Sequence, residues 1–221
     1  MAEKQSKNKW HTPAERIMML GFAAVILLGT ILLCLPVSAA DGKSVYWLDA
    51  LFTATTSVCV TGLVTVPTAT TWSTFGKIVI LGLIQFGGLG IMACLTMVFL
   101  ILRRKISLQS RKLIQDTYNL PVLKGSVGIV RRLLIGTATV EIAGAVLYSF
   151  WFVPEYGFWK GIGYSIFHAV SAFCNAGFDI LGRTDSPYPS LTAYAADPLV
   201  NIVIMLLIIV GGIGFLTWDD V

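Results

Sequence analysis

Four long apolar segments constrain this chain more than any other feature of its sequence. They cover residues 17–36, 75–102, 129–153 and 198–217. A helix needs about 20 mostly apolar residues to cross the roughly 30 Å hydrocarbon core of a bilayer. Only 13% of the 221 residues are charged, against about 25% in an ordinary soluble domain. We therefore expect an all-α polytopic membrane protein with four transmembrane helices.

The positions of lysine and arginine predict the orientation of these segments. Four basic residues precede the first segment and eight lie between Arg103 and Arg132, whereas residues 37–74 and 153–197 hold three together. Because cytoplasmic loops carry the excess of basic residues, we expect a multi-pass protein of the cell membrane with both termini in the cytoplasm. The net charge of +4 gathers on that inner face, where it suits anionic lipid headgroups of the bilayer rather than nucleic acid.

The chain contains an internal repeat. The stretch ALFTATTSVCVTGL, residues 50–63, aligns with SIFHAVSAFCNAGF, residues 165–178, and GGLG at residues 87–90 matches GGIG at 211–214. In both copies the first match lies between two long apolar segments and the GGxG match lies within the second of them, and this common order indicates duplication. The predicted organisation is a cytoplasmic N-terminus, a first helix–pore-loop–helix unit, a basic cytoplasmic linker and a second such unit, with bounds 1–16, 17–102, 103–128 and 129–221.

Each unit also contains a shorter apolar segment that ends beside a glycine. We expect helices near residues 45–59, capped by Ser44, and 158–174. Both are too short to cross a bilayer but suit a re-entrant helix that enters from outside and stops midway. Irregular backbone at membrane depth must be buried in protein or line a water-filled cavity, because bare peptide groups in lipid are costly. The stretch after each short helix is therefore expected to line water.

These stretches have the composition of a cation path. A cation gives up its water only where other oxygens replace it, and backbone carbonyls can do this where side chains are small. Glycine permits a positive φ in such a loop, and the C-terminal end of the short helix favours positive charge. The predicted selectivity filter, which holds potassium through backbone carbonyls alone, consists of Val60, Thr61, Gly62, Leu63, Asn175, Ala176, Gly177 and Phe178.

Three ionisable residues near these segments have more than one interpretation. Asp179 follows the second loop and could concentrate cations at the pore mouth or cap the loop. Glu141, within the third long segment, could touch the ion path, could simply be neutral, or could bond to a neighbouring helix such as the one bearing Asn201. For His168 we favour a satisfied buried side chain over a ligand or pH sensor. The glycines of GGLG and GGIG could be hinges, but close helix packing is their more usual role.

The residues that carry a family resemblance are SVCVTGL, AFCNAGF, the two GGxG patterns and the opening TPAERIMMLGFAAVILLGTILLCLP. With them the chain resembles the first half of the Trk/Ktr/HKT superfamily of potassium transporters, and is most similar to the Ktr-type membrane subunit. The resemblance implies potassium uptake, possible sodium coupling, and four units around one ion path with a filter glycine from each. Gly62 and Gly177 match the first two.

The resemblance also implies a homodimer and a cytoplasmic, nucleotide-binding, KtrA-like regulatory ring, which the basic linker could face. The third and fourth units are absent, so we expect this chain to be a fragment of a longer polypeptide. The alternative is a non-conducting two-unit scaffold or regulatory fragment. No nucleophile and base pair, phosphate loop or metal-ligand spacing is evident, and the four cysteines are read as packing residues. We therefore expect no enzyme activity and no cofactor.

Overall fold

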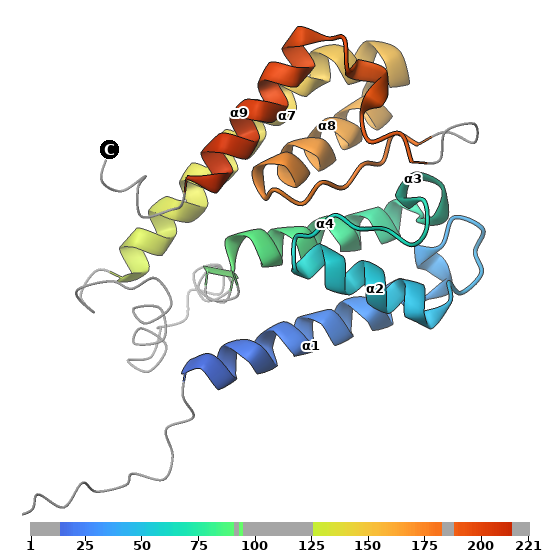
Figure 1. Ribbon diagram of the computed structural model, residues 1–221, viewed down its shortest axis with the longest axis vertical. Helices are drawn as coiled ribbons and strands as arrows, with labels where there is room; N and C mark the ends of the chain where they lie inside the picture. Colours follow the sequence, from blue (N-terminus) through green and yellow to red (C-terminus); the bar gives the residue numbers. More distant parts are fainter. Residues whose placement is uncertain (1–13, 91–92, 95–125, 183–187, 214–221) are drawn as a thin grey trace, which may run out of the picture.

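The computed structural model describes residues 14–90, 93–94, 126–182 and 188–213, and this part of the chain is helical without a β-strand. The expected all-α class is therefore confirmed. The helices form two groups in the order of the sequence (Figure 1). Most of the basic linker between the groups lies outside the described residues.

The first group contains three main helices that contact one another pairwise, with two short elements in their connections (Figure 1). Helix α1 precedes the short helix α2, and α4 runs back alongside both. The elements are α1 (Ala14–Cys34), η1 (Pro36–Ser38), α2 (Trp47–Val58), α3 (Thr68–Thr71) and α4 (Thr74–Leu89).

The second group repeats this order of a long helix, a short helix and a returning helix. Helices α7, α8 and α9 contact one another, and α8 also contacts α4 of the first group (Figure 1). One large apolar core runs through both groups, and a smaller apolar cluster joins the end of α4 to the start of α7. The elements are α7 (Ser126–Tyr156), α8 (Phe158–Phe173), η2 (Thr192–Tyr194) and α9 (Pro198–Gly212).

Side-chain caps explain where the two returning helices begin. The Ser73 hydroxyl accepts a hydrogen bond from the Gly76 N–H at the start of α4. The Asp197 carboxylate accepts from the N–H groups of Leu199 and Val200 at the start of α9, directly before Pro198. Each cap satisfies N–H groups that have no partner within the helix.

Several helix bounds differ from those expected. Helix α2 begins at Trp47 behind Tyr46, so the prediction of a Ser44 cap was wrong. Helix α4 ends at Leu89, because Gly90 has a φ of 80° that breaks the helix; an unbroken helix over 75–102 was therefore wrong. The short helix α8 ends at Phe173, within a residue of its expected end.

Helix length supports one membrane span directly. Among the described residues, the helix over Val127–Tyr156 is long and apolar enough to cross a bilayer, while Met18–Cys34, Thr74–Leu89 and Pro198–Gly212 form shorter apolar helices. The other three expected spans remain predictions.

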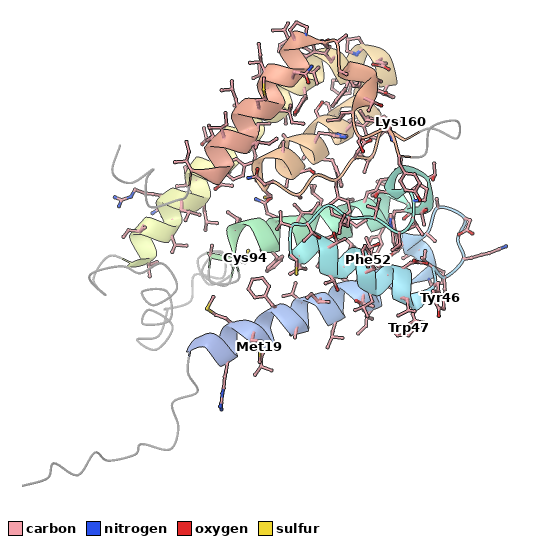
Figure 2. All side chains as sticks on the ribbon, in the orientation of Figure 1. Met19, Tyr46, Trp47, Phe52, Cys94 and Lys160 are labelled. Carbon is pink, nitrogen blue, oxygen red and sulfur yellow. The ribbon has the colours of Figure 1, made fainter. Side chains whose placement is uncertain are left out.

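Large apolar side chains cover the outer faces of α1 and α2. Met19 is 67% exposed and Trp47 56% exposed, and Figure 2 shows both pointing away from the helices. Tyr46 and Phe52 are also exposed. A surface of this composition suits lipid or further protein.

Candidate functional site

The two short helices end in the same hydrogen-bonded motif. At the end of α2, the Thr61 N–H donates to the Thr56 carbonyl at 3.0 Å, and the Val60 N–H donates to the Ser57 carbonyl at 3.3 Å. These 6→1 and 5→2 bonds define a Schellman motif. Cys59 is the last residue with right-handed helical geometry before the chain leaves the helix.

The end of α8 reproduces this motif with different side chains. The Ala176 N–H donates to the Ser171 carbonyl at 2.7 Å, and the Asn175 N–H donates to the Ala172 carbonyl at 3.0 Å. Cys174 takes the place that Cys59 has in the first group. The sequence repeat is therefore also a repeat of backbone geometry.

The residues after each helix have an unusual backbone. Val60 has a φ of 55° and Asn175 a φ of 59°, although neither is glycine. Asparagine tolerates this region fairly well, whereas a β-branched valine there is strained. Gly62 and Gly177 follow with φ values of 73° and 69°. The residues that end the helices are thus Val60 and Asn175, so Gly62 and Gly177 are not simple helix-ending glycines.

A hydroxyl from each short helix holds the residue after the glycine. In the first group, the Leu63 N–H donates to Thr56 Oγ1 at 3.0 Å. In the second, the Phe178 N–H donates to Ser171 Oγ at 2.9 Å, and the same hydroxyl donates to the Phe178 carbonyl. Thr56 and Ser171 were not among the predicted site residues, although the repeat alignment places them opposite each other.

The two glycine loops lie against each other. A Cβ added to Gly62 would overlap the carbonyl oxygen of Ala176 and come within 3.3 Å of the Gly177 Cα. The second loop runs between α8 and the first group (Figure 1). A cavity of about 70 Å³ at this junction is lined by Gly62, Gly177 and Asp179 among others. The structure therefore brings both predicted loops to one place.

Exposure differs between the two loops. Thr61, Leu63, Asn175 and Gly177 are exposed, while Val60 and Gly62 are half-buried. Ala176 and Phe178 are buried against the core, with Phe178 only 3% exposed. Each loop therefore keeps an open side after the two groups have packed together.

Glycines of the returning helices permit close contact with these loops. A Cβ on Gly87 would overlap the Val58 carbonyl at the end of α2, and one on Gly211 would overlap the Phe173 carbonyl at the end of α8. Gly88 lies in the same way against Cys174. These contacts favour the packing interpretation for the three glycines; Gly214 lies outside the described residues.

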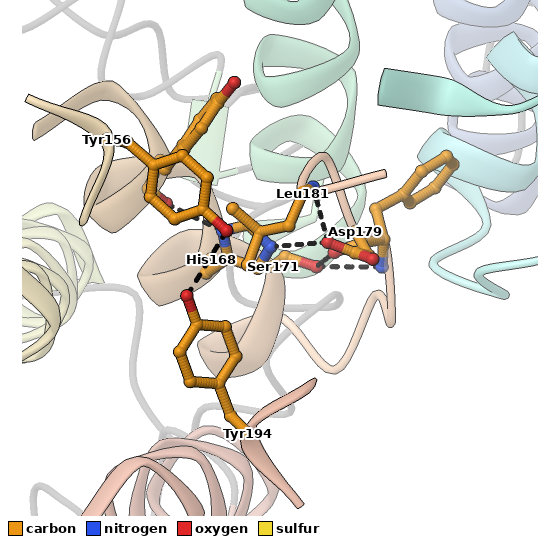
Figure 3. A network of polar contacts seen from close by, with 8 residues as sticks. Tyr156, His168, Ser171, Asp179, Leu181 and Tyr194 are labelled. Carbon is orange, nitrogen blue, oxygen red and sulfur yellow. Dashed lines mark hydrogen bonds and ion pairs between the residues drawn. The ribbon is translucent and has the colours of Figure 1, made fainter. Parts of the chain in front are cut away.

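His168 and Asp179 form a pair behind the second loop (Figure 3). Their Nε2 and Oδ1 atoms are 3.0 Å apart, and Oδ1 also accepts a hydrogen bond from the Leu181 N–H at 2.7 Å. Burial disfavours the charged carboxylate, but the hydrogen bond and charge of His168 outweigh it and hold the pKa of Asp179 below its ordinary value. Asp179 thus caps the loop through the Leu181 N–H and is also one of the residues that line the cavity.

Glu141 bonds to α4 and not to α9, the helix that bears Asn201. Both of its carboxylate oxygens accept from the Gln85 Nε2 of α4, at 2.9 and 3.1 Å. The Cys174 thiol lies 3.8 Å from the Gln85 Oε1. Asn201, the suggested partner, instead donates to the Tyr194, Ala195 and Asp197 carbonyls. Gln85 was missed because its partners are distant in the sequence.

Comparison with known proteins identifies the class to which this arrangement belongs. Residues 6–221 match the TrkH family, described as cation transport proteins, and the chain belongs to that family. The resemblance noted from the motifs is therefore confirmed, and the family makes this a membrane protein.

The alignments with several curated relatives cover nearly all of this chain. It is 42% identical over 222 residues to Ktr system potassium uptake protein B of Bacillus subtilis, covering 99% of this chain and 48% of the relative. It is 42% identical over 218 residues to potassium/sodium uptake protein NtpJ of Enterococcus hirae, covering 99% and 47%. A Ktr system potassium uptake protein B of Vibrio alginolyticus is 35% identical, covering 99% and 46%. The chain spans about half the length of these curated relatives.

Proposed function

We propose that this chain forms half of the ion path of a potassium uptake protein, and that its two glycine loops supply half of the selectivity filter. The observation that carries this proposal is the contact between Gly62 and the Ala176–Gly177 backbone, made by two loops with the same hydrogen bonds. Close packing alone would account for a glycine at one of these positions. It does not explain a duplicated loop whose two copies lie against each other at their glycines.

The loop geometry suits cation binding through carbonyl groups. Both loops have a positive φ at two positions, and backbone carbonyls of such an irregular loop can replace a cation's water. The C-terminal ends of α2 and α8 adjoin the two loops, and helix C-termini carry partial negative charge. These features support the eight filter residues 60–63 and 175–178 as the ion-binding segment.

The open sides of the loops support a path completed by further units. Thr61 and Asn175 are exposed beside the junction, as expected if two more loops close the ring. Under this proposal the ion is potassium, with sodium as a possible coupling ion, as the names of the relatives suggest. The full-length protein would be a homodimer in the cell membrane with cytoplasmic termini, bound to a KtrA-like ring.

Glycine substitutions in the full-length protein test the proposal. Gly62→Ala should abolish rubidium-86 uptake in cells that lack potassium uptake, because the added Cβ meets the Ala176 oxygen and φ is unfavourable. Gly177→Ala carries the φ strain alone, since its nearest atom would be 3.9 Å away; we expect a smaller loss of uptake.

Two glycines elsewhere provide matched controls. Gly82 of α4 has open space around a new Cβ, and Gly42 has open space with a φ of 72°. Gly82→Ala and Gly42→Ala should therefore keep uptake, because neither lies in a loop of the junction. Normal uptake and normal potassium preference in Gly62→Ala would contradict the proposal.

A further inference from the structure

The second loop is held by a pair of side chains that has no counterpart at the first loop. His168 on α8 and Asp179 after the loop are paired at 3.0 Å (Figure 3). The repeat alignment places Thr53 and Val64 at the matching positions of the first group. Valine has no polar side-chain atom to take part in a hydrogen bond, so the pair restrains one loop only.

His168 is itself firmly positioned. Its side chain is 2% exposed, and its Nδ1 lies 2.8 Å from the Tyr164 carbonyl one turn earlier in α8. The rings of Phe152 and Phe167 pack edge-on against it, with centroids 5.5 and 5.9 Å away. The imidazole is therefore fixed relative to α8, and through its hydrogen bond it holds Asp179 in place.

The hydrogen bonds fix where protons can be. A carbonyl only accepts, so Nδ1 must carry a proton. Nε2 then donates to the Asp179 carboxylate only if the ring is an imidazolium. In that state the two side chains together carry no net charge. The pair can thus tie the loop without placing an uncompensated negative charge behind it.

We propose that His168 and Asp179 are a positioning pair that sets the discrimination between potassium and sodium at the second loop. This inference rests on the proposed function of that loop. Carbonyl oxygens directed at one path repel one another, so a loop that can relax inward would fit a smaller cation better. The pair acts with Ser171, which binds both the N–H and the carbonyl of Phe178, the residue directly before Asp179.

The test replaces the pair by the residues of the first group, as H168T, D179V and the double variant, in the full-length protein. The double variant leaves no buried unpaired charge, so it is the variant expected to fold. The readout is the sodium concentration that halves rubidium-86 uptake, divided by the KM for rubidium. This ratio does not depend on the amount of protein, so loss of expression alone would not change it.

We expect the double variant to lower this ratio roughly tenfold, the scale on which a hydrogen bond to a charged group acts. His168→Gln should retain most of the ratio, because its amide can donate to the carboxylate. Ser165→Ala should leave it unchanged: Ser165 is buried on the same helix, but its hydroxyl bonds only within α8 at the Gly161 carbonyl.

An unchanged ratio in the double variant would overturn the inference, as would an equal loss in His168→Gln. Failure of the proposed filter function would give a different set of results. If Gly62→Ala also transported rubidium normally, the loops would not line the ion path at all. A defective Gly62→Ala with a normal double variant would contradict the positioning role alone.

Discussion

The hydroxyl groups of Thr56 and Ser171 are the residue-scale feature most closely tied to the loops. Each accepts the N–H of the residue that follows a filter glycine, and each lies on the last turn of a short helix. A buried N–H that loses its acceptor costs about 1–3 kcal/mol. The two hydroxyls therefore help to keep the strained backbone after Val60 and Asn175 in a single conformation.

We expect Thr56→Val to destabilise the first loop and to weaken potassium preference, because valine keeps the shape of threonine without its acceptor. The matched control is Thr55→Val, since the Thr55 hydroxyl donates to the Leu51 carbonyl within α2 and to no loop residue among those the structure describes. Thermal unfolding of the purified full-length protein and sodium competition against rubidium-86 uptake measure the two effects. Equal unfolding temperatures and equal sodium competition in the two variants would show that the Thr56 hydroxyl does not hold the loop.

The carboxylate of Asp179 predicts an acid-sensitive contribution to stability. Its folded-state pKa is below the ordinary value of 3.8, so the stabilisation is present above that value and is lost as the pH falls through the folded-state pKa. Its titratable neighbours are His168 and Tyr164. Below about pH 4, the unfolding temperature of the wild type should fall more steeply than that of Asp179→Asn. Parallel curves would show that the carboxylate contributes nothing.

At the scale of elements, the returning helices position the ends of the short helices. Gly87 of α4 and Gly211 of α9 each lie where a Cβ would overlap a carbonyl of the helix end they contact. Overpacking of this kind typically costs about 1–3 kcal/mol. The contact is the same in both groups, so it belongs to the repeated unit.

Gly87→Ala should therefore lower the stability of the full-length protein and reduce uptake by moving the end of α2. Gly82→Ala provides the control on the same helix, five residues earlier and with open space around the new Cβ. Thermal unfolding and rubidium-86 uptake would be measured for both. If Gly87→Ala matched the control, the end of α2 would not depend on this contact.

The sequence was sufficient to predict the order of long and short helices and the position of the two glycine loops, though not every helix bound, because both follow local patterns. Apolar length gave the long helices, and the aligned glycines gave the two loops, whose positive φ values agree with the residue chosen. The bond between Gln85 and Glu141 was not predictable, since it joins residues 56 apart. Nor was the left-handed conformation of Val60, because tertiary contacts override the backbone preference of valine there.

At the scale of the whole molecule, two similar groups meet through α4, α8 and the two loops. The exposed apolar faces of α1, α2 and α9 suit lipid or additional units of the full-length protein. The arrangement of basic residues predicts that the start of α7 faces the cytoplasm and that the loop before α9 faces outward.

Cysteine labelling tests this orientation. In the full-length protein without its native cysteines, Tyr188→Cys should react with a membrane-impermeant thiol reagent added to intact cells, because Tyr188 is 53% exposed before α9. Gly128→Cys, at the exposed start of α7, should react only after the membrane is opened. The reverse pattern would show that the orientation is wrong.

The most direct measurement of the central claim is protection of the first loop by potassium. Thr61 is exposed beside the junction of the loops, so Thr61→Cys in the cysteine-free full-length protein should react with a cationic thiol reagent and lose rubidium-86 uptake. Potassium in the outer solution should slow this reaction more than sodium does, while Thr65→Cys, farther along the chain, should be unaffected by either ion. Modification of Thr61→Cys that leaves uptake intact, at a rate independent of potassium, would contradict the assignment of these loops to the ion path.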